Sequence, residues 1–516
     1  MKLEIGILNL GIEWQLLLDQ IGVPYSIFDN ERSFQDINEF PVLIINDFKK
    51  TYTNEINKYL SSGGVVITNA KLAKSFLHFS KNNIYVKYLS TDEKLFQDNL
   101  FCDIYKNLTC VKNANLFANE VAKNLFYINN ISEGIIVVIP DEFIEIISDN
   151  RTMRKKFPSE FGQRYVTEKV AKISKGKIRI IIHRLLEYLY QLKKLPFVTK
   201  WNFPEKEKNI FCFRVDSDYS SIQQINDLHK TCESNQIKAS WFIEIKSIEN
   251  QLQVFNQFKN QELGYHCFRH KIYSSYQNNL DEINHGLELL RKIGLNPKGY
   301  AAPYGEWNEI LNTALEHFNF LYSSEFCYDY DNLPSFPILG NNFSKVLQIP
   351  IHPISVGRLS KTKHAEDEML KYFSDIISEK FYFDEPIIFY THPFQNRFHI
   401  FSELFQEVSN LGIKNYSLLE YAHWWKERLN VKWHVDYRNN KILIDTSNHD
   451  EKFSCKVRLP NGDVFIETIT NGEINCKNKL AQKIIYDKKI NFSDLRKFDV
   501  NLLKEEIIFR LRRLKQ

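Results

Sequence analysis

The chain has few glycines and prolines, 18 and 15 among 516 residues, which excludes collagen-like and low-complexity proteins. No apolar run approaches the roughly 18–20 residues that cross a membrane as a helix. The positive charge excess is small, because 67 Lys and Arg oppose 63 Asp and Glu. This balance argues against a protein that binds nucleic acid over a broad surface. Hydrophobic residues (43%) and charged residues (25%) are in the proportions of a folded protein.

The sequence also lacks the cysteine patterns of disulfide-rich and zinc-ribbon proteins. Its eight cysteines form no CxxC pair, and a chain of this length does not need a disulfide framework. We therefore expect reduced thiols. Near the N-terminus, Glu4 interrupts the apolar segment and no small-residue cleavage site follows, so the segment predicts a first strand and not a secretion signal. Together these features predict a cytoplasmic protein.

Apolar runs and helical patterns divide the chain into four parts and predict an α/β multidomain fold. Residues 1–100 alternate strands and helices, which is typical of a parallel α/β sheet. Residues 101–205 form a connecting α/β region. Residues 206–429 repeat strand–helix units, and residues 430–516 form a β-rich module followed by a helix.

The N-terminal part contains strands at Leu3–Leu10, Pro24–Phe28, Pro41–Ile45 and Val65–Thr68. This arrangement resembles the flavodoxin-like fold of class I glutamine amidotransferases, whose nucleophile is a cysteine on a strand-to-helix turn. Residues 1–101 contain no cysteine. We therefore expect a non-catalytic structural or binding domain.

About seven strand–helix units between residues 206 and 429 predict a central seven-stranded (β/α) barrel, complete or incomplete, rather than an open sheet. In such a barrel the active residues follow the carboxyl ends of the strands. The predicted strands are Ile210–Val215, Lys238–Ile245, Leu263–Phe268, Gly299–Ala302, Phe320–Ser323, Val346–Ile351 and Pro386–Thr391.

The segment after Leu429 predicts a small β-sandwich-like module, because short strands are split by the hairpin signals Asn439-Asn440 and Asn461-Gly462. A helix from about Val500 follows. Residues 477–516 carry 12 basic and 5 acidic residues, so the positive excess of the chain belongs to this tail.

The predicted C-terminal helix has an apolar face, formed by Leu503, Ile507, Leu511 and Leu514. Two interpretations stay open. The helix either docks on the protein with its charges in water, or makes a peripheral contact with an anionic membrane.

Polar residues follow four strands of the predicted barrel, in order along the chain. Asp216-Ser217-Asp218 ends the first strand, and His266 with His270 ends the third. Pro303-Tyr304-Gly305 follows the fourth strand, and His392 follows the last. Each pattern alone is weak. Their succession at strand ends indicates a functional site.

This succession, over residues 209–429, resembles the polysaccharide deacetylase family (NodB homology, carbohydrate esterase family four). The resemblance implies that Asp218, His266 and His270 bind a divalent metal ion, zinc first, with cobalt, nickel or manganese as alternatives. It also implies that Asp216 is the general base. The Asp216-Ser217-Asp218 spacing is closer to the branch that removes formyl groups from lipid-linked aminosugars.

The resemblance further assigns His392 as the general acid, and backbone N–H groups near Tyr304 as oxyanion donors. His352 is a rival acid, because it also ends a strand and precedes a proline. Asp329 and Asp331 are expected on a solvated loop.

One position departs from the family pattern. The family places an arginine two residues before the proline of its third motif, where it tethers the catalytic aspartate, and this chain has Ala301 there. Arg214 or Arg269 can substitute for it. Without a substitute, Asp216 would be poorly held and activity would be low.

The resulting hypothesis is a hydrolase of non-peptide carbon–nitrogen bonds, which removes an acetyl or formyl group from an N-acylated aminosugar of a glycan or glycan precursor. A lipid-linked substrate and a role in exopolysaccharide biosynthesis fit this hypothesis, and a nucleic-acid partner does not. Two alternatives remain. One is a deacetylase-like carbohydrate-binding protein with impaired catalysis, and the other is an amidase or cyclic imidase of the same fold.

Overall fold

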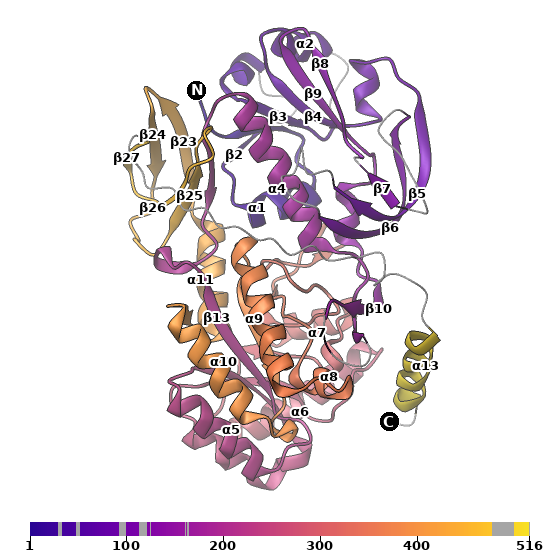
Figure 1. Ribbon diagram of the computed structural model, residues 1–516, viewed down its shortest axis with the longest axis vertical. Helices are drawn as coiled ribbons and strands as arrows, with labels where there is room; N and C mark the ends of the chain where they lie inside the picture. The colour runs from indigo at the N-terminus through magenta and orange to yellow at the C-terminus, as the bar shows by residue number, and fades with distance from the viewer. Residues whose placement is uncertain are drawn as a thin grey trace. The chain divides into compact units, whose positions relative to one another are not determined.

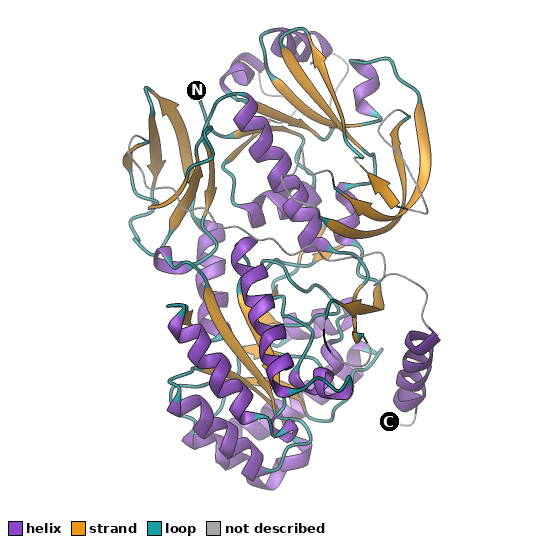
Figure 2. Cartoon of the chain, viewed as in Figure 1, coloured by secondary structure: helices purple, strands orange, loops and turns teal. Residues whose placement is uncertain are grey.

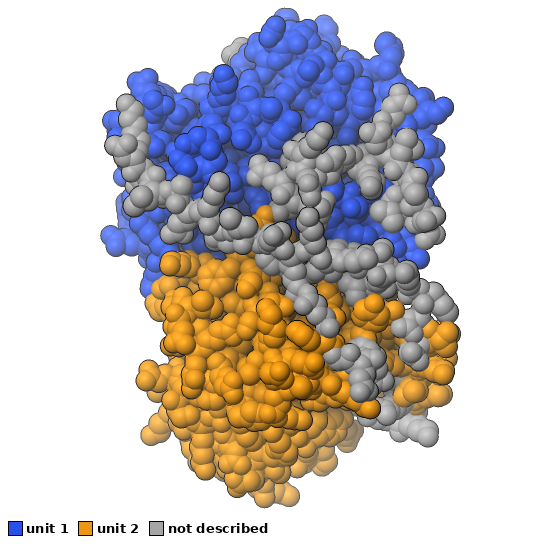
Figure 3. Space-filling model, viewed as in Figure 1, with its two compact units in different colours: residues 1–149, 173–206, 426–484 blue, residues 150–172, 207–425, 485–516 orange. Residues whose placement is uncertain are grey.

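The computed structural model describes residues 1–28, 34–47, 52–91, 100–112, 121–123, 125–159, 161, 165–476 and 500–514. The chain forms two compact units (Figures 1 and 3). Unit one comprises residues 1–149, 173–206 and 426–484, and unit two comprises residues 150–172, 207–425 and 485–516.

Unit one contains a largely parallel sheet with the strand order β2-β1-β3-β4-β9-β8. Its central strands are apolar on both faces and buried, as expected for parallel strands covered on both sides. The four strands predicted in the first hundred residues are confirmed, and β9 extends the sheet beyond residue 100. The strands are β1 (Ile5–Leu8), β2 (Tyr25–Phe28), β3 (Val42–Ile45), β4 (Val65–Asn69), β8 (Tyr127–Ile131) and β9 (Gly134–Ile139).

The rest of unit one consists of helices and smaller sheets. A second sheet has the order β6-β5-β7, and two antiparallel sheets have the orders β12-β25-β26 and β23-β24-β27. The short strands predicted after Leu429 are confirmed as β23 to β26, β27 is an additional strand, and β12 from the middle of the chain pairs with β25. These elements are α1 (Ile12–Ile21), α2 (Thr53–Ser61), β5 (Lys81–Ser90), β6 (Phe101–Val111), β7 (Val121–Lys123), α4 (Lys175–Leu192), β12 (Phe197–Lys200), β23 (Trp433–Arg438), β24 (Lys441–Thr446), β25 (Ser454–Arg458), β26 (Val464–Thr468) and β27 (Gly472–Asn475).

Unit two is built on a curled parallel sheet with the order β20-β17-β16-β15-β14-β13-β21. The N–H of His352, after β20, donates to the carbonyl of Ile388 in β21 (3.1 Å), which links the two ends of this order. The sheet is compatible with the predicted barrel, and all seven predicted strands are confirmed. They are β13 (Ile210–Asp216), β14 (Ala239–Glu244), β15 (Glu262–Cys267), β16 (Gly299–Tyr300), β17 (Tyr322–Ser323), β20 (Leu347–Gln348) and β21 (Ile387–Thr391).

Helices lie along the outside of this sheet (Figure 2). Helix α5 begins at a capping box, in which the Ser221 hydroxyl accepts from the N–H of Gln224 while the Gln224 side chain accepts from the N–H of Ser221. The helices are α5 (Ile222–Ser234), α6 (Tyr276–Lys292), α7 (Glu309–His317), α8 (Val356–Lys361), α9 (Glu366–Tyr382), α10 (Phe398–Asn410) and α11 (Leu418–Asn430), of which α11 runs on into unit one.

A hairpin from the predicted connecting region, β10 (Thr152–Phe157) and β11 (Val166–Ala171), also belongs to unit two. The N–H of Ala171 donates to the carbonyl of Phe326 (3.0 Å), and the Lys169 ammonium contacts the Glu306 carboxylate (2.8 Å). The hairpin therefore supports the segments that follow β16 and β17.

The C-terminal helix α13 (Val500–Leu514) turns its acidic side chains toward this hairpin. Glu505 accepts from the Thr167 hydroxyl (2.6 Å), and Glu506 lies 3.5 Å from Arg154. About half of the surface of Leu503 and of Leu511 is exposed. Among the described side chains the helix thus contacts the hairpin through carboxylates, while Leu503 and Leu511 of its predicted apolar face are half exposed and the Leu514 side chain lies outside the described residues. Docking of the helix with its basic charges in water stays a prediction.

Membrane contact through α13 stays a prediction. Within the described parts of the chain, none of the helices combines the length and the apolar character needed to traverse a bilayer. All eight cysteines are free thiols, as the sequence predicts.

Candidate active site

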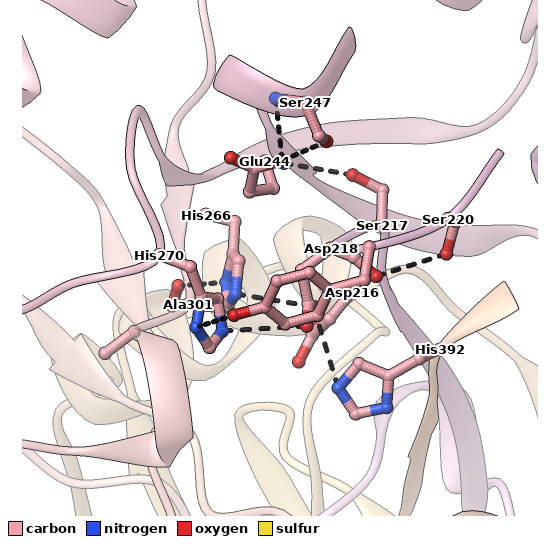
Figure 4. Close-up of polar contacts among 12 residues, drawn as sticks. Asp216, Ser217, Asp218, Ser220, Glu244, Ser247, His266, His270, Ala301 and His392 are labelled. Carbon is pink, nitrogen blue, oxygen red and sulfur yellow. Dashed lines mark hydrogen bonds and ion pairs between the residues drawn. The ribbon is translucent and has the colours of Figure 1, made fainter. Parts of the chain in front are cut away.

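The polar side chains at the carboxyl ends of the strands in unit two lie around Asp218. The Nε2 atoms of His266, His270 and His392 each lie 3.6 Å from an Asp218 carboxylate oxygen (Figure 4). Asp216 is two residues away and equally buried, with 3% of its surface exposed. The structure thus brings together the five residues that the sequence places at, or just beyond, the carboxyl ends of β13, β15 and β21.

The turn after β13 fixes the position of Asp218. The N–H of Ser217 donates to the carbonyl of Phe242 in β14 (3.0 Å), and the Ser217 hydroxyl accepts from the N–H of Glu244 (2.9 Å). The Ser220 hydroxyl donates to the carbonyl of Asp218 (3.2 Å). These bonds hold the Asp218 backbone beyond the end of the strand, so its carboxylate points at the histidines.

His266 and Asp218 present paired, unsatisfied atoms. His266 Nδ1 lies 2.6 Å from the carbonyl of Ala301, so Nδ1 carries the hydrogen and Nε2 has a free lone pair. His266 Nε2 and Asp218 Oδ1 are both buried, and neither has a hydrogen-bond partner among the residues that the structure describes. A lone pair and a carboxylate oxygen left in this way fit a bound cation.

His270 adds a third candidate ligand atom to this group. Its Nδ1 lies 3.1 Å from the Tyr219 hydroxyl, and its Nε2 faces Asp218 Oδ2. One ligand atom from each of Asp218, His266 and His270 lies within 4.8 Å of the others, and the same holds for Asp216, Asp218 and His392. Two imidazoles and a carboxylate are a ligand set typical of a catalytic zinc ion.

The hydrogen bonds of His392 decide between the two groups. The Oε1 atom of Gln395 accepts from the N–H of Gly357 (3.1 Å) and from the Thr391 hydroxyl (3.2 Å), so the Gln395 amide nitrogen donates to His392 Nδ1 (3.0 Å). His392 Nε2 then carries the hydrogen and has no lone pair for a metal ion. The group of Asp218, His266 and His270 therefore fits a metal ion better.

Arg214 holds Asp216 by two parallel hydrogen bonds. Its Nε and Nη2 atoms each lie 2.7 Å from one oxygen of Asp216, and its Nη1 donates to the carbonyl of Ser324. Burial alone would raise the pKa of Asp216, but the Arg214 guanidinium lowers it below its ordinary value, so Asp216 is ionised. Arg214 thus supplies the tether that Ala301 cannot.

The other substitute considered from the sequence, Arg269, does not hold Asp216. The Arg269 guanidinium lies over the ring of Phe268, 5.4 Å from the ring centre. The backbone N–H of Arg269 donates to the Glu282 carboxylate (2.9 Å).

Burial controls the charge of the remaining groups. Burial and the neighbouring charge of Asp216 raise the pKa of Asp218 well above its ordinary value. Burial lowers the pKa of His266 and of His392 to about 4, and that of His270 to about 3. The imidazoles are therefore neutral at pH 7, which is the form in which histidine binds a metal ion.

Tyr304 lies beside this site. Its ring centre is 4.5 Å from that of His270, its side chain is half-buried, and its backbone is left-handed (φ 60°). The oxyanion role predicted for the N–H groups near Tyr304 stays a prediction.

His352, the rival acid, belongs to a separate buried network. Its Nδ1 lies 3.1 Å from Asp331 Oδ1, and its Nε2 lies 3.1 Å from the Tyr372 hydroxyl. The Lys380 ammonium also contacts Asp331 (2.7 Å). The expectation of a solvated loop is wrong, because Asp331 is paired on two sides and Asp329 is 2% exposed. Both ring nitrogens of His352 are engaged away from Asp218.

This network yields a prediction for stability. Burial would raise the pKa of Asp331, but Lys380 and His352 lower it below its ordinary value. Replacing Asp331 by asparagine is expected to lower the free energy of unfolding by about 3 kcal/mol at pH 7. The thermal midpoint should then fall by roughly 6 to 12 °C. A carboxylate with a lowered pKa stabilises the fold above its unfolded pKa of about 3.9 and loses that effect as the pH falls.

Thermal unfolding of the parent and Asp331→Asn between pH 7 and pH 3 tests this expectation. The difference between the midpoints should shrink below about pH 4. Equal midpoints at pH 7, or a difference that persists undiminished at pH 3, would contradict it.

Neither a family model nor a curated protein matches the sequence. The solved structures that match include a peptidoglycan deacetylase and members of carbohydrate esterase family 4. The peptidoglycan deacetylase PdaC of Bacillus subtilis is 13% identical with a TM-score of 0.32, and the match covers 43% of this chain and 94% of that chain. A family 4 carbohydrate esterase from Streptomyces lividans is 12% identical with a TM-score of 0.30, over 40% of this chain and 92% of that one.

A pseudoenzyme of the same family from Bacillus anthracis also matches, at 13% identity and a TM-score of 0.31, over 43% of this chain and 68% of that one. Enzymes and a pseudoenzyme thus match this chain at almost the same level.

Two residues of the site were not identified from the sequence. Tyr219 directly follows Asp218, and Gln395 lies three residues after His392. Their positions just beyond strand ends are the available signal. Their contacts with ring nitrogens depend on backbone turns that no periodic pattern specifies.

Proposed function

We propose that this protein is a metal-dependent hydrolase that removes an acyl group, first of all acetyl, from an N-acylated aminosugar. The observation that carries the proposal is the geometry around Asp218. The lone pairs of His266 and Asp218 converge there without a hydrogen-bond partner among the described residues, and His270 adds a third ligand atom. Beside them Asp216 is kept ionised by Arg214.

Asp218, His266 and His270 would hold the metal ion. Such an ion, when bound, makes a water molecule more acidic and polarises the carbonyl group of an amide. Asp216 would accept the proton of the attacking water, because it is ionised and buried at the same strand end. Arg214 fixes both oxygens of that carboxylate, so the carboxylate needs no reorientation during proton transfer.

His392 would donate to the departing amine, because its Nε2–H points toward Asp218. In the free protein its imidazole is neutral. Protonation at Nδ1 would replace the hydrogen bond from Gln395 by a contact between two donors. Acid catalysis by His392 therefore requires that Gln395 releases this bond and that Nδ1 takes up a proton from solvent before the amine departs; Nε2 then gives its proton to the amine, and the ring is left neutral with its hydrogen on Nδ1.

Two features favour a sugar substrate and an active enzyme. Phe394 is 39% exposed and its ring centre lies 5.3 Å from that of His392, so it offers a flat apolar surface beside the reacting groups. The alternative of impaired catalysis depends on Ala301. Without an arginine at position 301, Asp216 would lack a tether, but Arg214 holds Asp216 in place and so weakens the case for impaired catalysis.

The test combines metal analysis with a substrate panel. The purified protein is assayed for acetate and formate release from N-acetylated and N-formylated glucosamine oligomers, and for hydrolysis of a cyclic imide. We expect acetate release that a chelator abolishes and added Zn²⁺ restores. Formate release alone would favour the formyl branch, and imide hydrolysis alone would favour the cyclic imidase. Metal-free protein without chelator-sensitive hydrolysis of any substrate would overturn the proposal.

A further inference from the structure

Tyr219 has a backbone conformation that tyrosine rarely adopts. It follows Asp218 directly and is left-handed, with φ 58°. Bulky side chains cost free energy in this region, whereas glycine and asparagine adopt it readily. A strained residue persists only where the surroundings or the function of its side chain offset the strain.

Packing in the core does not offset this strain, because 59% of the Tyr219 surface is exposed. The side chain instead extends over His270. Its hydroxyl lies 3.1 Å from His270 Nδ1, and the centres of the two rings are 5.1 Å apart. The strain is therefore associated with a contact to one of the proposed metal ligands.

The hydroxyl contact determines how His270 faces Asp218. With Nδ1 engaged by Tyr219, His270 Nε2 remains directed at Asp218 Oδ2. A partner on the second ring nitrogen fixes the orientation and tautomer of a ligand histidine, and losing it typically weakens metal binding about 10- to 100-fold. The carbonyl of Ala301 has this function for His266.

The Tyr219 side chain is largely exposed beside a second exposed ring. The ring of Phe394 lies 6.4 Å away, between ring centres, at an angle of 75°. Two exposed rings at nearly a right angle, next to the proposed ligands, form an apolar corner that suits the C–H face of a pyranose ring.

We propose that Tyr219 is a positioning residue for His270 and that the outer face of its ring binds the sugar of the substrate. This inference rests on the proposed function. The left-handed backbone at residue 219 is the conformation that allows one side chain to reach both His270 and the substrate.

Two variants distinguish the contribution of the Tyr219 hydroxyl to metal binding from that of the ring to substrate binding. Tyr219→Phe keeps the ring, and we expect a Zn²⁺ affinity at least about 10-fold lower with an unchanged KM at saturating Zn²⁺. Tyr219→Asn loses both groups but suits the left-handed backbone. We expect the same loss of Zn²⁺ affinity, a higher KM, and a thermal midpoint of the metal-free protein equal to or above that of the parent.

Zn²⁺ affinity is measured by competition with a chromophoric chelator, and unfolding is measured on metal-free protein. Tyr85→Phe is the matched control, because Tyr85 is a comparably exposed tyrosine (47%) in unit one. Parental Zn²⁺ affinity in Tyr219→Phe would overturn this inference and leave the proposed function untouched. A lowered thermal midpoint of metal-free Tyr219→Asn would also overturn it, because a structural role would then suffice. A parent that binds no Zn²⁺ would overturn the proposed function as well.

Discussion

Replacing Asp218 by asparagine is expected to abolish metal binding and to lower kcat roughly a thousandfold or more, because the proposed ion would lose its single carboxylate ligand. The asparagine amide would bring a neutral group, and in one orientation an N–H donor, to the His266 and His270 nitrogens. The same substitution should raise the thermal midpoint of the metal-free protein. A buried carboxylate oxygen without a hydrogen-bond partner among the described residues destabilises the fold, and asparagine removes its charge.

The opposite signs of these effects make the prediction specific. Bound metal is measured by elemental analysis, and unfolding is followed with and without a chelator. Asp281→Asn, on helix α6, is the matched control and should behave as the parent, because Asp281 is exposed and contacts the Gln277 side chain. Parental metal content in Asp218→Asn would contradict the proposed ligand set.

Replacing Arg214 by lysine is expected to lower kcat by roughly a hundredfold while metal binding persists. Lysine keeps the charge but cannot bond both oxygens of Asp216 in parallel, so the base loses its fixed orientation. The pKa of Asp216 should also rise toward its ordinary value, since Arg214 is the largest of the influences that lower it. The acidic limb of the profile of kcat/KM against pH should therefore move to higher pH.

Kinetics at several pH values together with metal analysis test this prediction. Arg214→Met should in addition destabilise the protein by about 3 to 5 kcal/mol, because Asp216 would be a buried and unpaired charge. Asp216→Asn serves as the comparison and should abolish hydrolysis without loss of metal. Parental kcat and pH dependence in Arg214→Lys would show that Asp216 needs no tether.

The sequence predicted the strands of unit two because their apolar runs are short, buried and separated by helical patterns. It also predicted which residues would meet, because parallel strands place their carboxyl ends at one edge. The choice between Arg214 and Arg269 was open, although Arg214 and Asp216 lie two residues apart on a strand and so share a face. The structure shows this contact, whereas Arg269 lies in the irregular segment after β15.

Contacts between distant segments could not be predicted. His352 and His392 both end a strand and precede a proline, so local sequence does not distinguish them. The difference comes from Asp331, in the segment after β17, and Tyr372, on helix α9, which both contact His352. The pairing of β12 with β25 and the position of hairpin β10–β11 likewise depend on tertiary packing.

The division of the chain also bears on its synthesis. The chain passes between the two units after residues 149, 172, 206, 425 and 484, so neither unit is a continuous segment. Domains generally fold in order as they leave the ribosome. Here strands β23 to β27 of unit one emerge only after almost all of unit two. A nascent chain stopped at residue 429 would therefore contain every residue of the site, with unit one still incomplete.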